Sequence, residues 1–130
     1  MRAMMIAALL LATASTAQAA PLTVQMGETW LFTVKDGEPV NAQKAGPSAK
    51  PAKGQLMVTA RALFGTNMII TNNSSTAYIY RAELFVSGEP SGARSCTLPA
   101  NGLPVMEQWP QKADAVRISD FQAAPRGGRC

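Results

Sequence analysis

The residues that could carry out covalent or metal chemistry are few, because the sequence has no histidine and only two cysteines among its 130 residues. The lack of histidine excludes Ser-His-Asp and Cys-His catalysis, as well as the usual zinc sites. The sequence also contains no carboxylate-rich calcium loop and no glycine-rich phosphate-binding motif. We therefore expect no metal site, no cofactor and no enzymatic activity.

Two acidic residues leave one alternative to this expectation. Glu107 and Asp120 lie in the C-terminal part of the chain with Trp109 between them, and a glycosidase needs two carboxylates that face each other across a cleft. A small carbohydrate-active enzyme that uses this pair is therefore kept as an alternative. Trp109 precedes Pro110 in a segment rich in turn-forming residues, so we expect a half-exposed indole. Trp109 and Glu107 are candidate contact residues for a sugar or a peptide.

The first nineteen residues have the pattern of a secretory signal peptide. Arg2 supplies the positive charge, an apolar run follows, and Ala17-Gln18-Ala19 forms the cleavage site. Cleavage after Ala19 would leave a mature chain with 11 basic and 8 acidic residues, a net charge of +3. No later segment is apolar for long enough to span a bilayer. We expect a periplasmic or secreted bacterial protein with no stable membrane insertion after cleavage.

Cys96 and Cys130 are expected to form a disulfide bond, because an exported protein with two cysteines meets an oxidising compartment. The loop closed from Cys96 to Cys130 would contain 35 residues. The bond would hold the C-terminal segment against the rest of the domain. The alternative is that Cys130 pairs with another chain. A redox-active pair is not expected, since the C-x-x-C arrangement is absent.

Alternation of apolar and polar residues predicts the fold class. The alternating segments are rich in β-branched and aromatic residues, which favours half-buried strands; they are 29–34, 55–64, 67–71, 77–86 and 115–121. Residues 55–86 are expected to form three consecutive antiparallel strands, because turn-forming residues separate the runs. The pattern predicts one all-β domain over residues 20–130, a small antiparallel β-sandwich of immunoglobulin-like architecture by analogy. The side chains expected to face its core include Trp30, Phe32, Ala62, Phe64, Tyr78 and Tyr80.

Residues 36–54 differ in composition from the rest of the chain. The segment contains three prolines, three glycines and one large aliphatic side chain, which predicts a mobile loop. Its lysines, Lys44, Lys50 and Lys53, make it mildly basic and are candidate contact residues. A nucleic-acid partner is not expected, because that function needs clustered phosphate contacts.

These features together predict an exported, monomeric, non-enzymatic domain with a binding or structural role in the bacterial envelope. We expect an envelope protein or a glycan as the partner. The contacts are expected in the segments 36–54 and 99–112, since loops on rigid β scaffolds commonly hold the functional residues. The alternative is a protein inhibitor or assembly factor that pairs an exposed strand edge with its partner.

Overall fold

The computed structural model describes residues 20–124, which form nine β-strands and no helix. The strands are β1 (Leu22–Gln25), β2 (Thr29–Lys35), β3 (Glu38–Ala45), β4 (Leu56–Arg61), β5 (Thr66–Asn72), β6 (Tyr78–Val86), β7 (Glu89–Leu98), β8 (Val105–Trp109) and β9 (Ala115–Ala123). The predicted all-β fold class is therefore confirmed. The predicted signal peptide, residues 1–19, lies outside the described residues.

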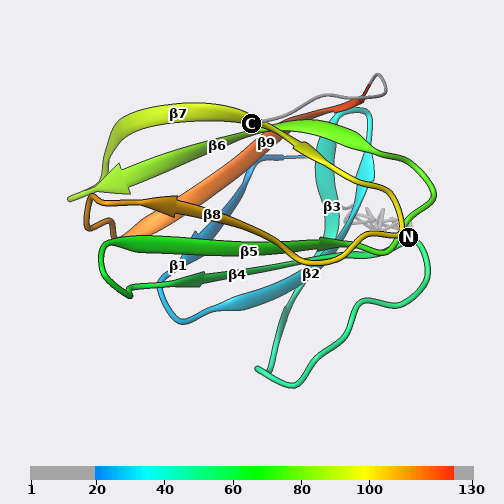
Figure 1. The fold of residues 1–130 in the computed structure, drawn as a ribbon, viewed down its shortest axis with the longest axis horizontal. Helices are drawn as coiled ribbons and strands as arrows, with labels where there is room; N and C mark the ends of the chain where they lie inside the picture. The colour runs from blue at the N-terminus through cyan, green and yellow to red at the C-terminus, as the bar shows by residue number, and fades with distance from the viewer. Residues whose placement is uncertain (1–19, 125–130) are drawn as a thin grey trace, which may run out of the picture.

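The strands form two antiparallel sheets that lie one above the other (Figure 1). The four-stranded sheet has the order β1-β9-β6-β7, and the five-stranded sheet has the order β3-β2-β4-β5-β8. Four strands therefore lie at sheet edges, namely β1, β7, β3 and β8.

The prediction of three consecutive paired strands over residues 55–86 is wrong in its last part. β4 and β5 do pair, but β6 pairs with β7 and β9 in the other sheet. The buried side chain of Asn72 stabilises this crossing, because its amide donates to the carbonyls of Thr76 (2.8 Å) and Pro99 (3.1 Å). Turn-forming residues after Asn72 are compatible with a hairpin within one sheet and with a connection that crosses to the other sheet. The local sequence does not distinguish these two possibilities.

Side chains from both sheets form one hydrophobic core. Phe121 of β9 lies at the centre of an aromatic group, stacked on Tyr80 with 5.5 Å between ring centroids. Its ring also meets Phe32 and Tyr78 edge-on, at 5.8 Å and 5.7 Å. Because Phe32 belongs to the five-stranded sheet and the other three to the four-stranded sheet, this group joins the two layers.

Three strands lie where connections were predicted. Residues 38–45 form β3 instead of a mobile loop, because the two-residue turn Asp36-Gly37, with both φ angles positive, returns the chain alongside β2. Ser87-Gly88 forms a similar turn and starts β7. β8 occupies part of the segment 99–112. All three are edge strands, and β3 and β7 have too many exposed positions to show a period of two.

The hydroxyl group of Tyr80 gives a prediction about stability. The side chain is fully buried, and its oxygen has no hydrogen-bond partner. A buried unsatisfied hydroxyl costs about 1–2 kcal/mol, so Tyr80→Phe is expected to raise the free energy of unfolding by about that amount. Urea denaturation at neutral pH measures the difference. A fall in stability would show that the hydroxyl is stabilised in the folded protein.

The same residue predicts a pH dependence. Burial raises the pKa of the Tyr80 phenol, and the Glu107 carboxylate raises it further. A phenol whose pKa is higher in the folded state contributes stability that is complete below the unfolded value of about 10 and is lost at higher pH. The wild type should therefore lose stability above about pH 10, and Tyr80→Phe should lose less. Tyr78→Phe is the matched control and should retain the loss of the wild type.

Candidate functional site

The predicted contact residue Trp109 is buried, with 7% of its surface exposed. It points inward from β8 together with Glu107, and Arg94 of β7 contacts both side chains. The Arg94 guanidinium lies 4.8 Å from the centre of the Trp109 ring and 3.2 Å from a Glu107 carboxylate oxygen. The prediction of a half-exposed Trp109 is therefore wrong, because alternate residues of β8 face the core. These residues hold the two sheets together.

Glu107 and Asp120 are not brought together by the fold. Glu107 lies on β8, while Asp120 lies beside the β2–β3 turn, where its backbone N–H donates to Glu38 Oε1 at 3.3 Å. β3 and β8 are opposite edges of the five-stranded sheet, about 19 Å apart at four strand spacings. Glycosidases need their two carboxylates within about 10 Å. The geometry gives no support to a catalytic pair.

The three candidate lysines differ in their surroundings. Lys44 lies on β3, and its ammonium group is 2.6 Å from a Glu28 carboxylate oxygen. The hydrogen bond from Lys44 lowers the pKa of Glu28, and the backbone N–H of Gln25 lowers it further. Lys50 and Lys53 are exposed in the connection 46–55 between β3 and β4. A surface ion pair such as Lys44–Glu28 contributes little to stability, and the structure assigns no ligand to these lysines.

Only one of the two cysteines can be placed. Cys96 is buried on the inward face of β7. Cys130 lies outside the described residues, so the pairing of the two stays a prediction.

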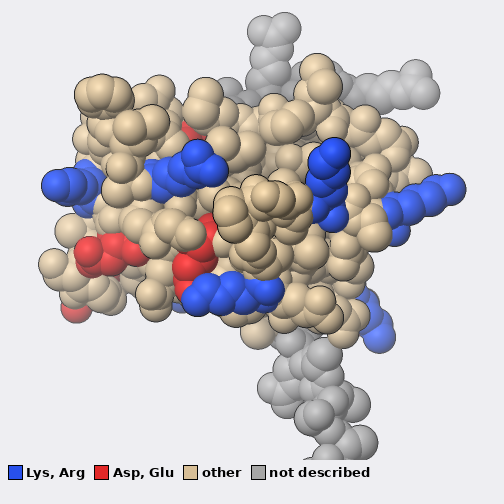
Figure 2. Space-filling model, turned by 90° about the horizontal axis from the view of Figure 1, so that it is seen from below, with Lys and Arg blue, Asp and Glu red and all other residues tan. Residues whose placement is uncertain are grey.

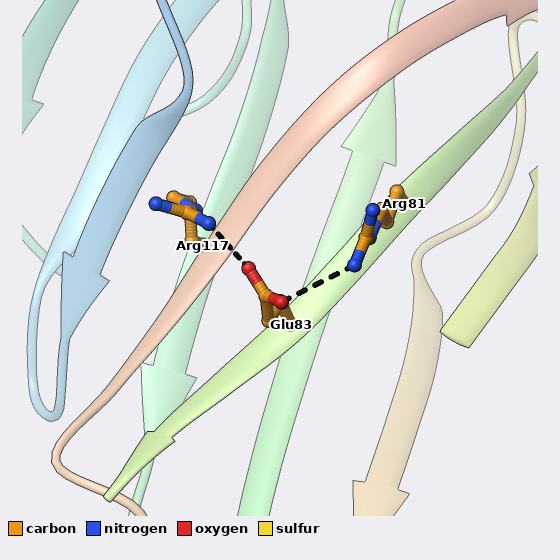
Figure 3. Close-up of polar contacts among 3 residues, drawn as sticks. All are labelled: Arg81, Glu83 and Arg117. Carbon is orange, nitrogen blue, oxygen red and sulfur yellow. Dashed lines mark hydrogen bonds and ion pairs between the residues drawn. The ribbon is translucent and has the colours of Figure 1, made fainter. Parts of the chain in front are cut away.

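Three charged residues form a cluster on the outer face of the four-stranded sheet (Figure 3). The Glu83 carboxylate of β6 lies between the guanidinium groups of Arg81 and Arg117, which both donate hydrogen bonds to it. Arg117 also lies over the Phe85 ring, 4.7 Å from its centre. Glu83 and Arg117 are direct partners on neighbouring strands, so the cluster links β6 and β9. Its carboxylate is already neutralised by two arginines, which makes it unsuitable as a general base.

A cavity of about 250 Å³ lies between the start of β1 and the first half of β3. Its lining includes Leu22, Pro39, Val40 and Asn41. None of the side chains that line it is ionisable.

The residue with the least expected environment is Phe64. It lies in the turn between β4 and β5, it is 88% exposed, and its φ angle is +51°. A bulky side chain rarely adopts this backbone conformation, and such outliers occur mainly at functional sites. Leu63 beside it is 57% exposed. The prediction that Ala62 and Phe64 face the core is wrong, because β4 and its alternation end at Arg61 and both residues are exposed.

Neighbouring residues hold this turn in place. The Asn67 side-chain amide donates to the Leu63 carbonyl, and the Thr66 hydroxyl donates to the Gln111 carbonyl at 2.8 Å. The same hydroxyl accepts from the backbone N–H of Ala113 at 3.0 Å. Both Thr66 and Asn67 are buried. We call the residues 61–65 the Phe64 turn; it presents two apolar side chains from a fixed backbone.

The Phe64 turn lies at one end of the two-layered fold. The connections 26–28 and 110–114 lie at the same end. Backbone hydrogen bonds join Ala60 to Glu28, and they join Asp114 to Met26 and to Phe85. The exposed Leu103 lies at the opposite end, in a connection that bonds to residues 72–74. The two ends can therefore be compared experimentally.

Charges of both signs lie near the Phe64 turn, because the connections at this end include Glu28 and Asp114. Glu28 is paired with Lys44, and the Asp114 carboxylate accepts a hydrogen bond from the Ser87 N–H. Arg61 and Lys112 are both exposed, and neither the segment 61–67 nor the segment 109–113 contains an acidic residue. Figure 2 looks at the protein from the side of the five-stranded sheet, and the acidic side chains visible there lie among basic ones toward the end where Figure 1 has the turn between β4 and β5. The exposed charged residues nearest the two apolar side chains in the contacting segments are Arg61 and Lys112, so a partner of the turn itself is expected to be neutral or negatively charged.

The four edge strands are poorly suited to pair with another protein. Each is either short or interrupted by proline or by a residue with positive φ, and such features block edge pairing. The residues concerned are Pro21 before β1, Pro39 and Asn41 in β3, Pro90 and Gly92 in β7, and Pro104 and Pro110 around β8. The edges therefore do not favour the strand-pairing alternative.

Comparison of the chain with protein-family models, curated proteins and solved structures found no match. Among residues 20–124, no group of three or more His, Cys, Asp or Glu side chains could hold a metal ion. In the same range, no helix is long and apolar enough to cross a membrane. The function is therefore argued from the side chains that the fold presents.

Proposed function

We propose that the chain is an exported, non-enzymatic β-sandwich domain that binds a component of the bacterial envelope through the Phe64 turn. The observation that carries this proposal is Phe64 itself, which is exposed and has a strained backbone in a turn that buried polar residues support. Selection for stability alone would favour glycine or asparagine at such a position. A contact with a partner gives a reason for the aromatic side chain.

The proposal includes an immunoglobulin-like sandwich architecture, by analogy, and a monomeric state. Its two antiparallel sheets and shared core support the architecture. It also includes an intramolecular disulfide between Cys96 and Cys130, which the expected oxidising compartment supports. Intact mass with and without alkylation under non-reducing conditions tests this bond. A free thiol or a cross-linked dimer would show that the bond does not form within one chain.

The test of the proposed function compares two exposed apolar positions. Tagged wild type, Phe64→Asn and Leu103→Asn are each incubated with the envelope fraction of the native bacterium. Retained lipid and protein are then measured. We expect Phe64→Asn to lose most of the retained material and Leu103→Asn to behave as the wild type, because Leu103 lies at the opposite end. Equal retention by all three proteins would show that the Phe64 turn is not the binding site.

Asparagine is the chosen substitution because it adopts positive φ more readily than other side chains except glycine. Loss of retention by Phe64→Asn therefore reports the loss of the aromatic ring and not a distorted turn. Circular dichroism of each variant checks that the β fold is unchanged. Deletion of residues 47–53 provides a second control, since the connection 46–55 is not part of the proposed site.

A further inference from the structure

We infer that the Phe64 turn docks the protein reversibly onto a membrane surface that contains anionic lipid. This inference rests on the proposed function and names the class of its partner. Leu63 and Phe64 would enter the region of the lipid headgroups, while Arg61 and Lys112 would stay at the level of the phosphates. The contact is peripheral, and no part of the domain crosses the bilayer.

The shape of the turn favours a membrane over a protein partner. Leu63 and Phe64 project from the end of the fold and are 57% and 88% exposed. A stable protein interface covers about 800 Å² on each partner and involves 20–30 residues. Among the large apolar side chains at this end, only these two are strongly exposed in residues 20–124. Two projecting apolar residues are far too few for such an interface, but they can insert between lipid headgroups.

The charge around the turn favours an anionic surface. Arg61 precedes the apolar pair in the chain, and Lys112 follows Gln111, whose carbonyl accepts the hydrogen bond from Thr66. The segments 61–67 and 109–113 contain these two basic residues and no acid. The acids in the neighbouring connections at this end are both engaged, Glu28 by Lys44 and Asp114 by the Ser87 N–H. Each basic side chain near an anionic membrane contributes to binding. The net charge of +3 expected for the mature chain acts in the same direction.

The rigidity of the turn supports the same conclusion. The Thr66 hydroxyl joins the turn to the 110–114 connection through two hydrogen bonds. The Asn67 amide fixes the Leu63 carbonyl. A turn that is already ordered loses little conformational freedom when it inserts, so even a small apolar area can give measurable binding.

Co-sedimentation with lipid vesicles tests the inference. The full chain is expressed, and the exported protein is purified. Vesicles of equal parts phosphatidylglycerol and phosphatidylethanolamine are compared with vesicles of phosphatidylcholine alone. We expect the wild type to sediment with the anionic vesicles, and we expect Phe64→Asn to bind at least about tenfold more weakly. Arg61→Gln and Lys112→Gln should each weaken binding about fivefold, with the effect lost at high salt.

A second measurement reports the position of the side chain. In Phe64→Trp, the new indole is placed at the exposed site, whereas Trp109 is buried in the core and Trp30 is partly buried, and both are also present in the control variant. The fluorescence emission of Phe64→Trp should move to shorter wavelength when anionic vesicles are added. Leu103→Trp is the matched control and should not shift. No shift in Phe64→Trp, or equal shifts in both variants, would overturn the inference.

The outcomes separate the membrane inference from the proposed function. If the wild type does not bind anionic vesicles, or if Phe64→Asn binds as well as the wild type, the membrane inference is wrong. If the envelope fraction nevertheless gives proteins whose retention depends on Phe64, the proposed function stands with a protein partner. If neither vesicles nor envelope material depends on Phe64, both are wrong.

Discussion

Substitution of Gly65 by alanine is expected to lower the free energy of unfolding by about 3 kcal/mol. The φ angle of Gly65 is +107°, a conformation that alanine rarely adopts. A Cβ atom would also lie 2.8 Å from the Pro110 carbonyl oxygen and closer still to that of Trp109. Both neighbours are backbone atoms that belong to β8 or follow it directly, so they cannot move without disturbing the edge of the five-stranded sheet.

The matched control for this substitution is Gly46→Ala. No atom lies within 4 Å of a Cβ at Gly46, and its φ angle is not positive. The expected change is within about 0.5 kcal/mol. Urea denaturation of both variants measures the difference. If Gly65→Ala unfolds at the same urea concentration as the wild type, the close packing of the Phe64 turn against β8 is not present in solution.

Removal of the proposed disulfide is expected to lower the stability more than Gly65→Ala does. Cys130→Ala should lower the free energy of unfolding by about 4 kcal/mol, because a cross-link between positions 96 and 130 restricts the unfolded chain. This variant is preferred to one at Cys96, because Cys96 is buried in the core and its replacement would add a packing cost. Denaturation of the wild type with and without reductant gives the same comparison without a mutation.

The disulfide prediction has a definite contrary result. If Cys130→Ala unfolds as the wild type does, no bond within the chain stabilises the domain. If the wild type is a dimer on a non-reducing gel and Cys130→Ala is a monomer, the cysteine pairs between chains. A typical domain has a stability of roughly 5–15 kcal/mol, so a loss of about 4 kcal/mol is easily measured.

The strands with a clear period of two were predictable, because one of their faces is buried in the core. Val58 and Ala60 of β4 and Tyr80 and Leu84 of β6 follow this pattern. The edge strands were missed, because most of their residues face solvent and carry no alternating pattern. Asp36-Gly37 is a strong hairpin signal and could have identified β3. The crossing from β5 to β6 depends on contacts that are distant in sequence and gives no local signal.

The candidate site was less predictable than the fold. Trp109 and Glu107 were assigned to the surface because β8 was read as a loop, and both residues are buried instead. Phe64 was assigned to the core because it continues the alternation of β4. The only local sign that the strand ends before Phe64 is the glycine that follows, Gly65. Positive φ at a phenylalanine has no local sequence signal, and the residues that follow it, Gly65 and Thr66, contact the backbone of residues 109–113, which is distant in sequence.

If Phe64 is the binding residue, it is retained at a cost in stability, because its backbone is strained. Both parts of this statement are tested by measuring the stability and the envelope retention of Phe64→Asn on the same preparation. We expect the free energy of unfolding to stay the same or to rise by up to about 1 kcal/mol, because asparagine relieves the strain. We also expect retention to fall to the background level. Unchanged retention, or a clear fall in the urea midpoint, would contradict this statement.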